Sequence, residues 1–345
     1  MSSKRFKAVI TDLIVDSLEP ERAVLGGIAD VEALDAHDER GLVGRIEDAD
    51  AVMLYHTLGL SRPTIEALTC CRAIVRCGVG YDNVDCEAAL KCGIPVMNVP
   101  DYGTEEVADS AIGMMLALTR GIAPVNTRLR GGNRPWSYTE AAPLYRLRDR
   151  VFAIVGLGRI GAAAAVRAKA FGMEVWFYDP YKPDGYDKAI GVRRADSLDE
   201  LLARAHVLSR HCPLTAGTDH MISAAAIDAM QAGSYLVNTA RGGLVETAAI
   251  PDAIASGRLA GAGIDLLETD PPSDVDPLLR AWRDAKHPAY ERVLLNPHSA
   301  FYCEEGVEEM RRKGAEACRR ALLGMPLRNV VNHFGLSPRG LISAS

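Results

Sequence analysis

Several features that define other protein classes are missing from this chain of 345 residues. No apolar run approaches the roughly 20 residues of a membrane-spanning helix. The eight cysteines form no C-x-x-C pair, which favours reduced thiols in a cytoplasmic protein over a disulfide framework. The net charge of −6 argues against a broad nucleic-acid-binding surface.

What is present is an alternation of short apolar segments and helical stretches. Strand-like segments occupy 6–13, 51–57, 73–80 and 93–100. Such alternation is typical of a parallel α/β sheet. Because the chain is too long for one ordinary core, we expect two α/β domains.

The middle of the chain contains a regular segment and then an irregular one. Apolar residues at helical spacing predict a helix over 105–120. Residues 121–149 are polar, and we expect them to leave the compact body as an irregular excursion. Trp136 and Tyr138 in this excursion would then mark a contact with a partner subunit.

The segment GLGRIG, residues 156–161, follows an apolar strand and opens an alanine-rich helix. In a dinucleotide-binding turn, Gly156 would turn the chain, Gly158 would let the backbone approach a pyrophosphate, and Gly161 would let helix and strand pack closely. The helix N-terminus would offer N–H groups to the phosphates, with Arg159 and Ile160 beside them. A plain glycine turn that binds no nucleotide is the alternative.

An acidic residue after the next strand refines this prediction. Asp179 stands 18 residues beyond Gly161 (179 − 161). Its carboxylate can accept hydrogen bonds from both ribose hydroxyls and would repel a 2′-phosphate. The sequence therefore predicts NAD rather than NADP as the cofactor.

Three polar clusters follow later apolar segments, namely NTARGG at 238–243, GIDLLETDPP at 263–272 and NPHSAF at 296–301. Each is expected at the C-terminal end of a strand, where open parallel sheets bind ligands. Arg241 can bind a carboxylate through two parallel hydrogen bonds. His298 can exchange a proton near neutral pH, and an acid of the middle cluster can orient it. Together with a nicotinamide, these groups indicate hydride transfer to a 2-oxo acid.

These motifs, in this order, resemble the D-isomer-specific 2-hydroxyacid dehydrogenase family over about residues 5–332. Within it the chain is most similar to the C-terminal-binding protein (CtBP) branch. The strings that carry this similarity are LYHT at 54–57, IVRCGVGYDNVD at 74–85, RAKAFGMEVWFYDPY at 167–181, NTARGGLV at 238–245 and HSAFYCEE at 298–305.

The resemblance implies two Rossmann-like α/β domains with a cleft between them. One is an NAD-binding, doubly wound parallel sheet over 102–299. The other is a flavodoxin-like substrate domain formed by 1–101 and 300–334, and 335–345 would be a loose C-terminal tail. A homodimer or a higher homo-oligomer is also implied.

The resemblance also implies a catalytic set of Arg241, Asp270 and His298. Arg241 would bind the carboxylate of a small anionic 2-oxo or 2-hydroxy acid, and His298 would be the acid–base. The family's glutamate precedes the proline of the middle motif, and here Asp270 stands there, one methylene shorter. Glu268 lies two positions earlier and does not match.

Further positions are carried over in the same way. The implied cofactor contacts are Thr104, Cys212, Pro213, Thr215, Thr239, Ala240 and Asp265. The implied substrate contacts are Arg76, Val79, Gly80, His56 and Phe301, although a structural role for His56 is an equal alternative. Phe301 stands where the CtBP branch has a tryptophan.

A metal site is not expected near RHCPLTAGTDH, residues 210–220. His211 and His220 lie nine positions apart (220 − 211), and no second ligand pair accompanies them. A different functional class remains open, because CtBP proteins are NAD(H)-dependent corepressors that bind peptides. The chain would then be an NAD(H)-sensing assembly protein with weak dehydrogenase activity.

Overall fold

The computed structural model describes residues 5–132 and 134–332, and it consists of two compact units. The first is formed by Met1–Gly103 and Cys303–Ser345, the second by Thr104–Tyr302. The expected division was 1–101 with 300–334, and 102–299. The expected loose tail, 335–345, lies outside the described residues.

The first unit is built on a five-stranded parallel sheet in the order β2-β1-β3-β4-β5. This is the flavodoxin-like order. Its strands are β1 (Phe6–Ile10), β2 (Ala29–Ala33), β3 (Ala51–Leu54), β4 (Ile74–Arg76) and β5 (Val96–Asn98), and its helical segments are α1 (Glu19–Leu25), η1 (Glu39–Leu42), α2 (Arg62–Glu66), α3 (Cys86–Lys91) and α13 (Glu304–Leu322). All residues of the strand segments 51–54 and 74–76 are buried, Arg76 included, as expected for strands covered on both faces.

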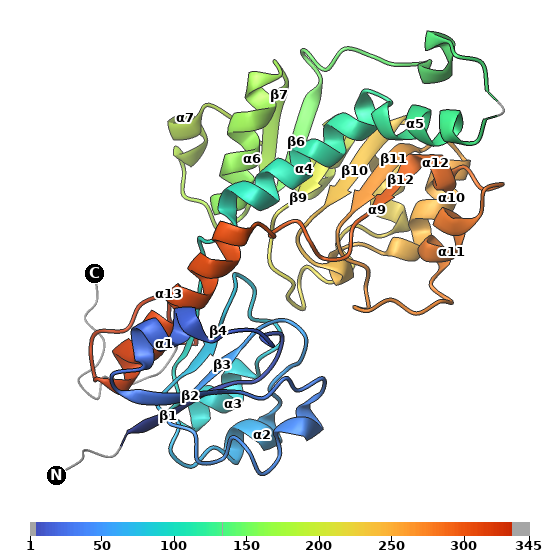
Figure 1. The fold of residues 1–345 in the computed structure, drawn as a ribbon. Helices are drawn as coiled ribbons and strands as arrows, with labels where there is room; N and C mark the ends of the chain where they lie inside the picture. Colours follow the sequence, from blue (N-terminus) through green and yellow to red (C-terminus); the bar gives the residue numbers. More distant parts are fainter. Residues whose placement is uncertain (1–4, 133, 333–345) are drawn as a thin grey trace. The chain divides into compact units, whose positions relative to one another are not determined.

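Helix α13 brings the C-terminal part of the chain onto this sheet, beside α1 (Figure 1). At Gly314 a Cβ would lie 2.6 Å from Sγ of Cys77, so only glycine allows this close approach. Arg311 of α13 forms a buried ion pair with Glu21 of α1, with Nε 2.6 Å from Oε1. The helix ends at Leu322, and Gly324 follows two residues later with φ +64°.

The second unit is built on a seven-stranded parallel sheet in the order β12-β11-β10-β9-β6-β7-β8. Counted from β6, this is the dinucleotide-binding order with one added strand, and the direction of the order reverses between β6 and β9. The strands are β6 (Val151–Val155), β7 (Glu174–Tyr178), β8 (Arg193–Arg194), β9 (Val207–Arg210), β10 (Ser234–Asn238), β11 (Leu259–Ile264) and β12 (Val293–Leu295). The prediction of an α/β fold with two parallel sheets is confirmed.

Helices cover both faces of this sheet with separate apolar cores. Helices α4 and α6 share one core, and α8, α9 and α10 contribute to the other (Figure 1). The helices are α4 (Thr104–Thr119), α5 (Ile122–Arg130), α6 (Arg159–Ala170), α7 (Tyr186–Ile190), α8 (Leu198–Arg204), α9 (Ala224–Ala229), α10 (Ile250–Ala255), α11 (Pro277–Arg283) and α12 (Ala289–Arg292), with the short turns η2 (Tyr138–Ala141), η3 (Gly242–Leu244) and η4 (Thr247–Ala249).

The prediction of an irregular segment at 121–149 was wrong in part. Residues 122–130 form α5 and 138–141 form η2. The helix was missed because it is only nine residues long, includes Pro124 and buries no residue, although Ile122, Val125 and Leu129 stand at helical spacing. Arg128 ties α5 to Glu291 of α12, with Nε 2.6 Å from Oε2.

Candidate active site

A line of residues paired between neighbouring strands crosses the seven-stranded sheet near its C-terminal edge. It shows where the candidate motifs lie along their strands. From β7 to β12 it runs through Tyr178, Val155, Arg210, Asn238, Ile264 and Leu295. Each predicted motif of this unit either contains a member of this line or begins directly after one. The parallel sheet therefore gathers the nucleotide motif and the three polar clusters at one edge.

The glycine turn after β6 has the geometry of a phosphate-binding loop. Gly156 has φ +89°, and a Cβ on Gly161 would lie 2.2 Å from the carbonyl oxygen of Gly156. Both positions require glycine for the fold itself. Gly158 is different, because no atom lies within 4 Å of the position its Cβ would take. It is also the N-cap of α6, where no side chain caps the helix. Arg159 and Ile160 form the first turn, so nothing acidic neutralises this helix end.

Asp179 lies directly after β7 and is held to the glycine turn. Its Oδ2 accepts a hydrogen bond from the Leu157 N–H at 2.9 Å, and its Oδ1 accepts one from the Tyr181 N–H at 3.0 Å. Each carboxylate oxygen can accept a further bond. The side chain is thus fixed beside the turn with acceptor capacity remaining for ribose hydroxyls.

Cys212 follows β9, next to the point where the strand order reverses. A Cβ on Gly156 would lie 2.7 Å from the Cys212 nitrogen, so the two loops touch. Pro213 and Thr215 continue this loop, which Thr218 closes by donating from Oγ1 to the Pro213 oxygen at 2.7 Å. Such reversal points are where open α/β sheets bind ligands.

Thr239 and Ala240 follow β10 at the same edge. The hydroxyl of Thr239 is buried and has no hydrogen-bond partner among the described residues. An unsatisfied buried hydroxyl costs free energy unless a ligand or water completes it. The open space at Gly158, the uncapped helix and this hydroxyl fit a bound dinucleotide.

The arginine cluster after β10 is ordered by an asparagine. Asn238 donates from Nδ2 to the Arg241 carbonyl at 2.8 Å, and its Oδ1 accepts from the Ala240 N–H at 3.2 Å. Arg241 donates from Nη1 to the Ala240 carbonyl at 2.8 Å. Its guanidinium is therefore held close to the end of β10.

Asp265 is a buried carboxylate that shapes the histidine turn. Its Oδ1 accepts from the N–H groups of Ser299 and Ala300 at 3.0 and 3.1 Å, and its carbonyl accepts from the His298 N–H at 2.8 Å. Burial raises the pKa of Asp265, partly offset by the hydrogen bonds from Ala300 and Ser299. His298 itself has φ +52°, a sparsely populated conformation for a residue with a side chain. Asp265 thus stabilises the backbone that presents His298.

The imidazole of His298 faces the acid that the motif predicted. Nδ1 of His298 lies 3.1 Å from Oδ2 of Asp270, and the ring of Phe301 packs edge-on against the imidazole with centroids 5.7 Å apart. His298 is 16% exposed and Asp270 50% exposed. The structure brings these three predicted residues together, and the shorter aspartate still reaches the histidine.

Glu268 belongs to a second pair on the same loop. Its Oε2 lies 2.9 Å from Nε2 of His220, and its Oε1 accepts from both N–H and Oγ1 of Thr247 at 2.9 Å. The backbone around it also touches the arginine cluster, because a Cβ on Gly242 would lie 1.9 Å from the Leu267 oxygen. Glu268 therefore links the loop of Asp270 to the segment of Arg241.

In the first unit the candidate residues also lie at the C-terminal edge of the sheet. Leu54, Arg76 and Asn98 pair across β3, β4 and β5, and His56, Val79 and Gly80 follow two of these strands. The buried Arg76 folds over Gly78, where a Cβ would lie 1.6 Å from Nη1.

Two residues that the sequence analysis missed organise these loops. Asp12 is buried and accepts from the N–H groups of Tyr55 and Thr57 at 2.8 and 2.9 Å, on either side of His56. Asn98 donates from Nδ2 to the Val79 carbonyl at 2.7 Å. Both are polar residues at or just after the end of an apolar strand. The criterion that selected the polar clusters after the later strands would also have selected these two residues.

The histidines of the 210–220 segment have separate partners. Nε2 of His211 lies 2.9 Å from Oγ of Ser209, and burial lowers the pKa of His211 to about 3. Over residues 5–132 and 134–332, no group of three or more His, Cys, Asp or Glu side chains is arranged to hold a metal. In the same part of the chain, every helix is too short or too polar to cross a membrane.

Comparison with known proteins identifies the family. Residues 112–300 match the model of the D-isomer specific 2-hydroxyacid dehydrogenase, NAD binding domain. The chain belongs to this family. It is 36% identical over 276 residues to a glyoxylate reductase of Korarchaeum cryptofilum, with 80% of each chain covered. The prediction of an NAD-binding oxidoreductase of this family is confirmed.

Two further relatives extend the comparison. A D-3-phosphoglycerate dehydrogenase of Methanocaldococcus jannaschii is 34% identical over 93% of this chain, which spans only 59% of that relative's length. The structure of an Aquifex aeolicus D-lactate dehydrogenase complexed with NAD and lactic acid has a TM-score of 0.81 and 26% identity, covering 92% of this chain and 96% of that one. These relatives do not support the prediction that the chain belongs to the CtBP branch.

Proposed function

We propose that the chain is an NAD-dependent 2-hydroxyacid dehydrogenase that reversibly transfers hydride between NADH and a small 2-oxo acid. The observation that carries the proposal is the contact of His298 with Asp270, 3.1 Å from Nδ1 to Oδ2. It lies at the sheet edge that also carries the glycine turn and Arg241. A histidine–carboxylate pair, an arginine and a dinucleotide site are the groups that this reaction needs.

The cofactor would be held by the residues of this edge. When bound, NADH supplies the hydride. The uncapped N-terminus of α6 suits the pyrophosphate, and Asp179 suits the adenosine ribose. The other proposed contacts are Gly156, Gly158, Arg159, Ile160, Gly161, Thr104, Cys212, Pro213, Thr215, Thr239, Ala240 and Asp265.

The protein's own chemistry centres on one proton. Because Nδ1 of His298 faces Asp270, the other ring nitrogen, Nε2, is the atom that would donate a proton to the substrate carbonyl oxygen. A carboxylate at hydrogen-bond distance favours the charged imidazolium that can donate. In the oxidation direction, Nε2 would accept the hydroxyl proton.

The substrate is proposed to be a small anionic 2-oxo acid. Arg241 would bind its carboxylate through the paired hydrogen bonds that a guanidinium forms. The additional proposed contacts are Arg76, Val79, Gly80, His56 and Phe301. The names of the relatives point to glyoxylate and lactate-type substrates as the first compounds to test.

Assembly and location complete the proposal. We propose a homodimer or larger homo-oligomer, since Trp136 and Tyr138 are 91% and 89% exposed on the described part of the chain. A cytoplasmic location remains a prediction. Among residues 5–132 and 134–332, no contact favours the alternative of a CtBP-like NAD(H)-sensing corepressor.

The test is a steady-state assay of the full chain with glyoxylate, pyruvate and 3-phosphohydroxypyruvate. NADH should support reduction of at least one acid, and kcat/KM with NADPH should be lower. Asp179→Ala should narrow that difference, because the residue no longer repels a 2′-phosphate. Tight NADH binding without turnover of any acid would instead favour the sensing alternative.

A further inference from the structure

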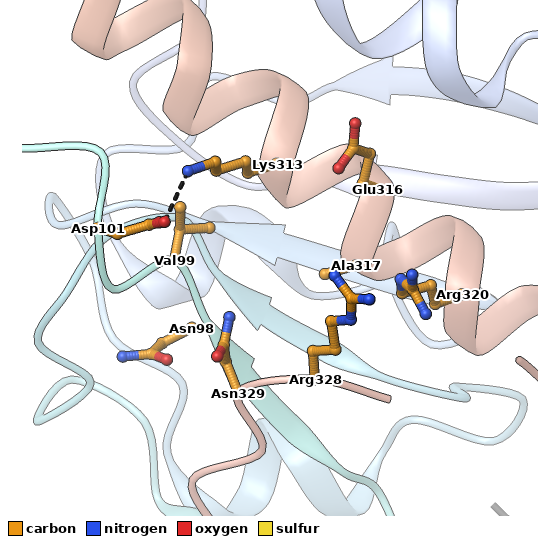
Figure 2. A pocket seen from close by; sticks show the side chains of 9 residues that line it. All are labelled: Asn98, Val99, Asp101, Lys313, Glu316, Ala317, Arg320, Arg328 and Asn329. Atoms are coloured by element: carbon orange, nitrogen blue, oxygen red, sulfur yellow. Dashed lines mark hydrogen bonds and ion pairs between the residues drawn. The ribbon is translucent and has the colours of Figure 1, made fainter. Parts of the chain in front are cut away.

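A second charged site lies within the first unit, among residues that the proposed reaction does not use. It is a cavity of about 170 Å³ between α13, the end of β5 and the segment after α13 (Figure 2). Its walls are formed by Asn98, Val99, Asp101, Lys313, Glu316, Ala317, Arg320, Arg328 and Asn329. Because drug-sized ligands occupy pockets of roughly 300–1,000 Å³, this cavity suits only a small molecule or ion.

Most of the charges around this cavity neutralise one another. Lys313 lies 2.8 Å from Asp101 and 2.7 Å from Glu309. Glu316 lies 2.7 Å from Nη1 of Arg312 on the same helix. Both carboxylates in the cavity wall are thus already engaged by cations.

Two arginines of the wall are left without an acidic partner among residues 5–132 and 134–332. Arg320 donates from Nη1 only to the Pro326 carbonyl, at 2.9 Å. Arg328 makes no ion pair within that part of the chain. Figure 2 shows Arg328 reaching toward α13 at Ala317, while Lys313 points toward Asp101. Position near the C-terminus of α13 can stabilise Arg320 by the helix dipole, but Arg328 is not on that helix.

We propose that this cavity binds a small oxyanion with two negative charges, such as a phosphate group or a short dicarboxylate. Two guanidinium groups in the wall of one small cavity repel each other, and a dianion bound by both would remove that repulsion. The planar fork of arginine matches the paired oxygens of phosphate and carboxylate alike. The amides of Asn98 and Asn329 add neutral polar groups to the same wall.

The site is connected to a loop that carries candidate substrate residues. Asn329 accepts at its carbonyl from the Asn98 N–H at 3.2 Å, and Asn98 donates from Nδ2 to the Val79 carbonyl at 2.7 Å. The next residues continue along β5, where Val331 donates to the Val96 carbonyl at 2.8 Å. An anion that joins Arg320 to Arg328 would therefore tie α13 to the segment that supports Val79. We infer that it stabilises the first unit and acts as an effector of that loop.

The first experiment measures binding and does not depend on turnover. Inorganic phosphate and succinate are titrated into the full chain at constant ionic strength, by calorimetry and by thermal unfolding. At least one should bind and raise Tm as its concentration passes Kd. Arg320→Gln and Arg328→Gln should each weaken binding about tenfold or more, the effect of losing a charge-assisted contact. Arg328→Lys should fall between, because it keeps the charge and loses the fork.

Three controls locate the effect. Arg45→Gln removes an exposed arginine of the same unit that lies outside the cavity wall, and it should leave binding unchanged. Arg241→Gln should also retain binding, which separates this site from the proposed active site. Each variant must show a cooperative thermal unfolding transition without anion, so that loss of folding is not mistaken for loss of binding. The proposal is overturned if neither probe raises Tm more than chloride does at the same ionic strength. It is also overturned if Arg320→Gln and Arg328→Gln bind the anion as tightly as the parent chain does.

Discussion

The carboxylate of Glu268 lies 2.9 Å from Nε2 of His220, so the loop before Pro271 carries two histidine–carboxylate pairs. Asp270 faces His298, and Glu268 faces away toward His220 and Thr247. Motif position predicted Asp270 rather than Glu268 beside His298, and Asp270 is the acid that contacts this histidine. What Glu268 does instead could not be predicted, because His220 is 48 residues away along the chain.

The pair of Glu268 and His220 should make stability depend on pH. The pKa of His220 is raised, chiefly by its hydrogen bond to Glu268. Burial acts to raise the pKa of Glu268, but hydrogen bonds from His220 and Thr247 lower it overall. The contribution of His220 is therefore present below about pH 6.5 and lost as pH rises through its raised pKa, and that of Glu268 is present above about pH 4.3 and lost as pH falls through its lowered pKa.

His220→Asn should accordingly lower Tm most between about pH 4.3 and 6.5, with a difference that shrinks at higher pH. The effect should be small, because His220 is 44% exposed and solvent screens the pair. In a Glu268→Gln background the same substitution should add little. A Tm difference that stays constant from pH 5 to pH 9 would show that the pair contributes nothing through charge.

The fold was largely predictable because local chemistry and fold agree at most positions. The apolar segment 151–155, the glycine turn and the helix after it repeat the pattern of a strand–turn–helix unit, and all three form. The segment 121–149 was not predictable in the same way, since α5 has only nine residues, includes Pro124 and buries none of its side chains. Regular structure there depends on contacts such as that of Arg128 with Glu291, which lie 163 residues apart.

The sequence indicated which residues form the candidate site. It indicated less well which residues stabilise the loops that carry them. His298 and Asp270 follow from motif order. Asp265 was expected at the nicotinamide, yet its carboxylate also stabilises the turn at Ser299 and Ala300. Such second roles depend on which backbone N–H groups a buried oxygen meets, and spacing in the sequence does not encode that.

Substitutions of His298 and Asp270 should reduce kcat/KM by different amounts. His298→Ala should reduce kcat/KM for the 2-oxo acid by about 10²–10⁴, the contribution of general acid–base catalysis. Asp270→Asn should reduce it less, and the decline of rate with rising pH should move to lower pH, because the imidazolium loses a negative neighbour. NADH affinity should stay nearly constant in both. Glu268→Gln is the matched control, and an Asp270→Asn enzyme with the parental pH profile would exclude Asp270 as the partner.

Self-association should depend on the exposed aromatics of the 121–149 segment. Charged side chains at Trp136 and Tyr138 would oppose burial of these residues in an interface. The double variant Trp136→Asp, Tyr138→Asp should therefore sediment as a smaller species than the parent at micromolar concentration. Tyr181→Asp is the control, since Tyr181 is 92% exposed outside the segment. A parent that sediments only as a monomer would remove the basis for the dimer.

The two glycines Gly158 and Gly161 separate the demands of the ligand from those of the fold. Ala at position 161 would place its Cβ 2.2 Å from the Gly156 oxygen, so the turn would have to shift. Overpacking of this kind costs typically about 1–3 kcal/mol, and Gly161→Ala should lower the free energy of unfolding in urea accordingly. Gly158 has φ −77° and open space around its Cβ position, so Gly158→Ala should leave that free energy unchanged or slightly higher.

NADH affinity should respond to Gly158→Ala in the opposite way to stability. If a pyrophosphate occupies the open space at α6, a methyl group there would displace it, and NADH should bind at least about tenfold more weakly, which is roughly 1.4 kcal/mol. NADH fluorescence titration of the folded variant measures this directly. A Gly158→Ala protein that is as stable as the parent and binds NADH equally well would mean that the space serves no phosphate, and the cofactor would then have to approach the sheet edge elsewhere.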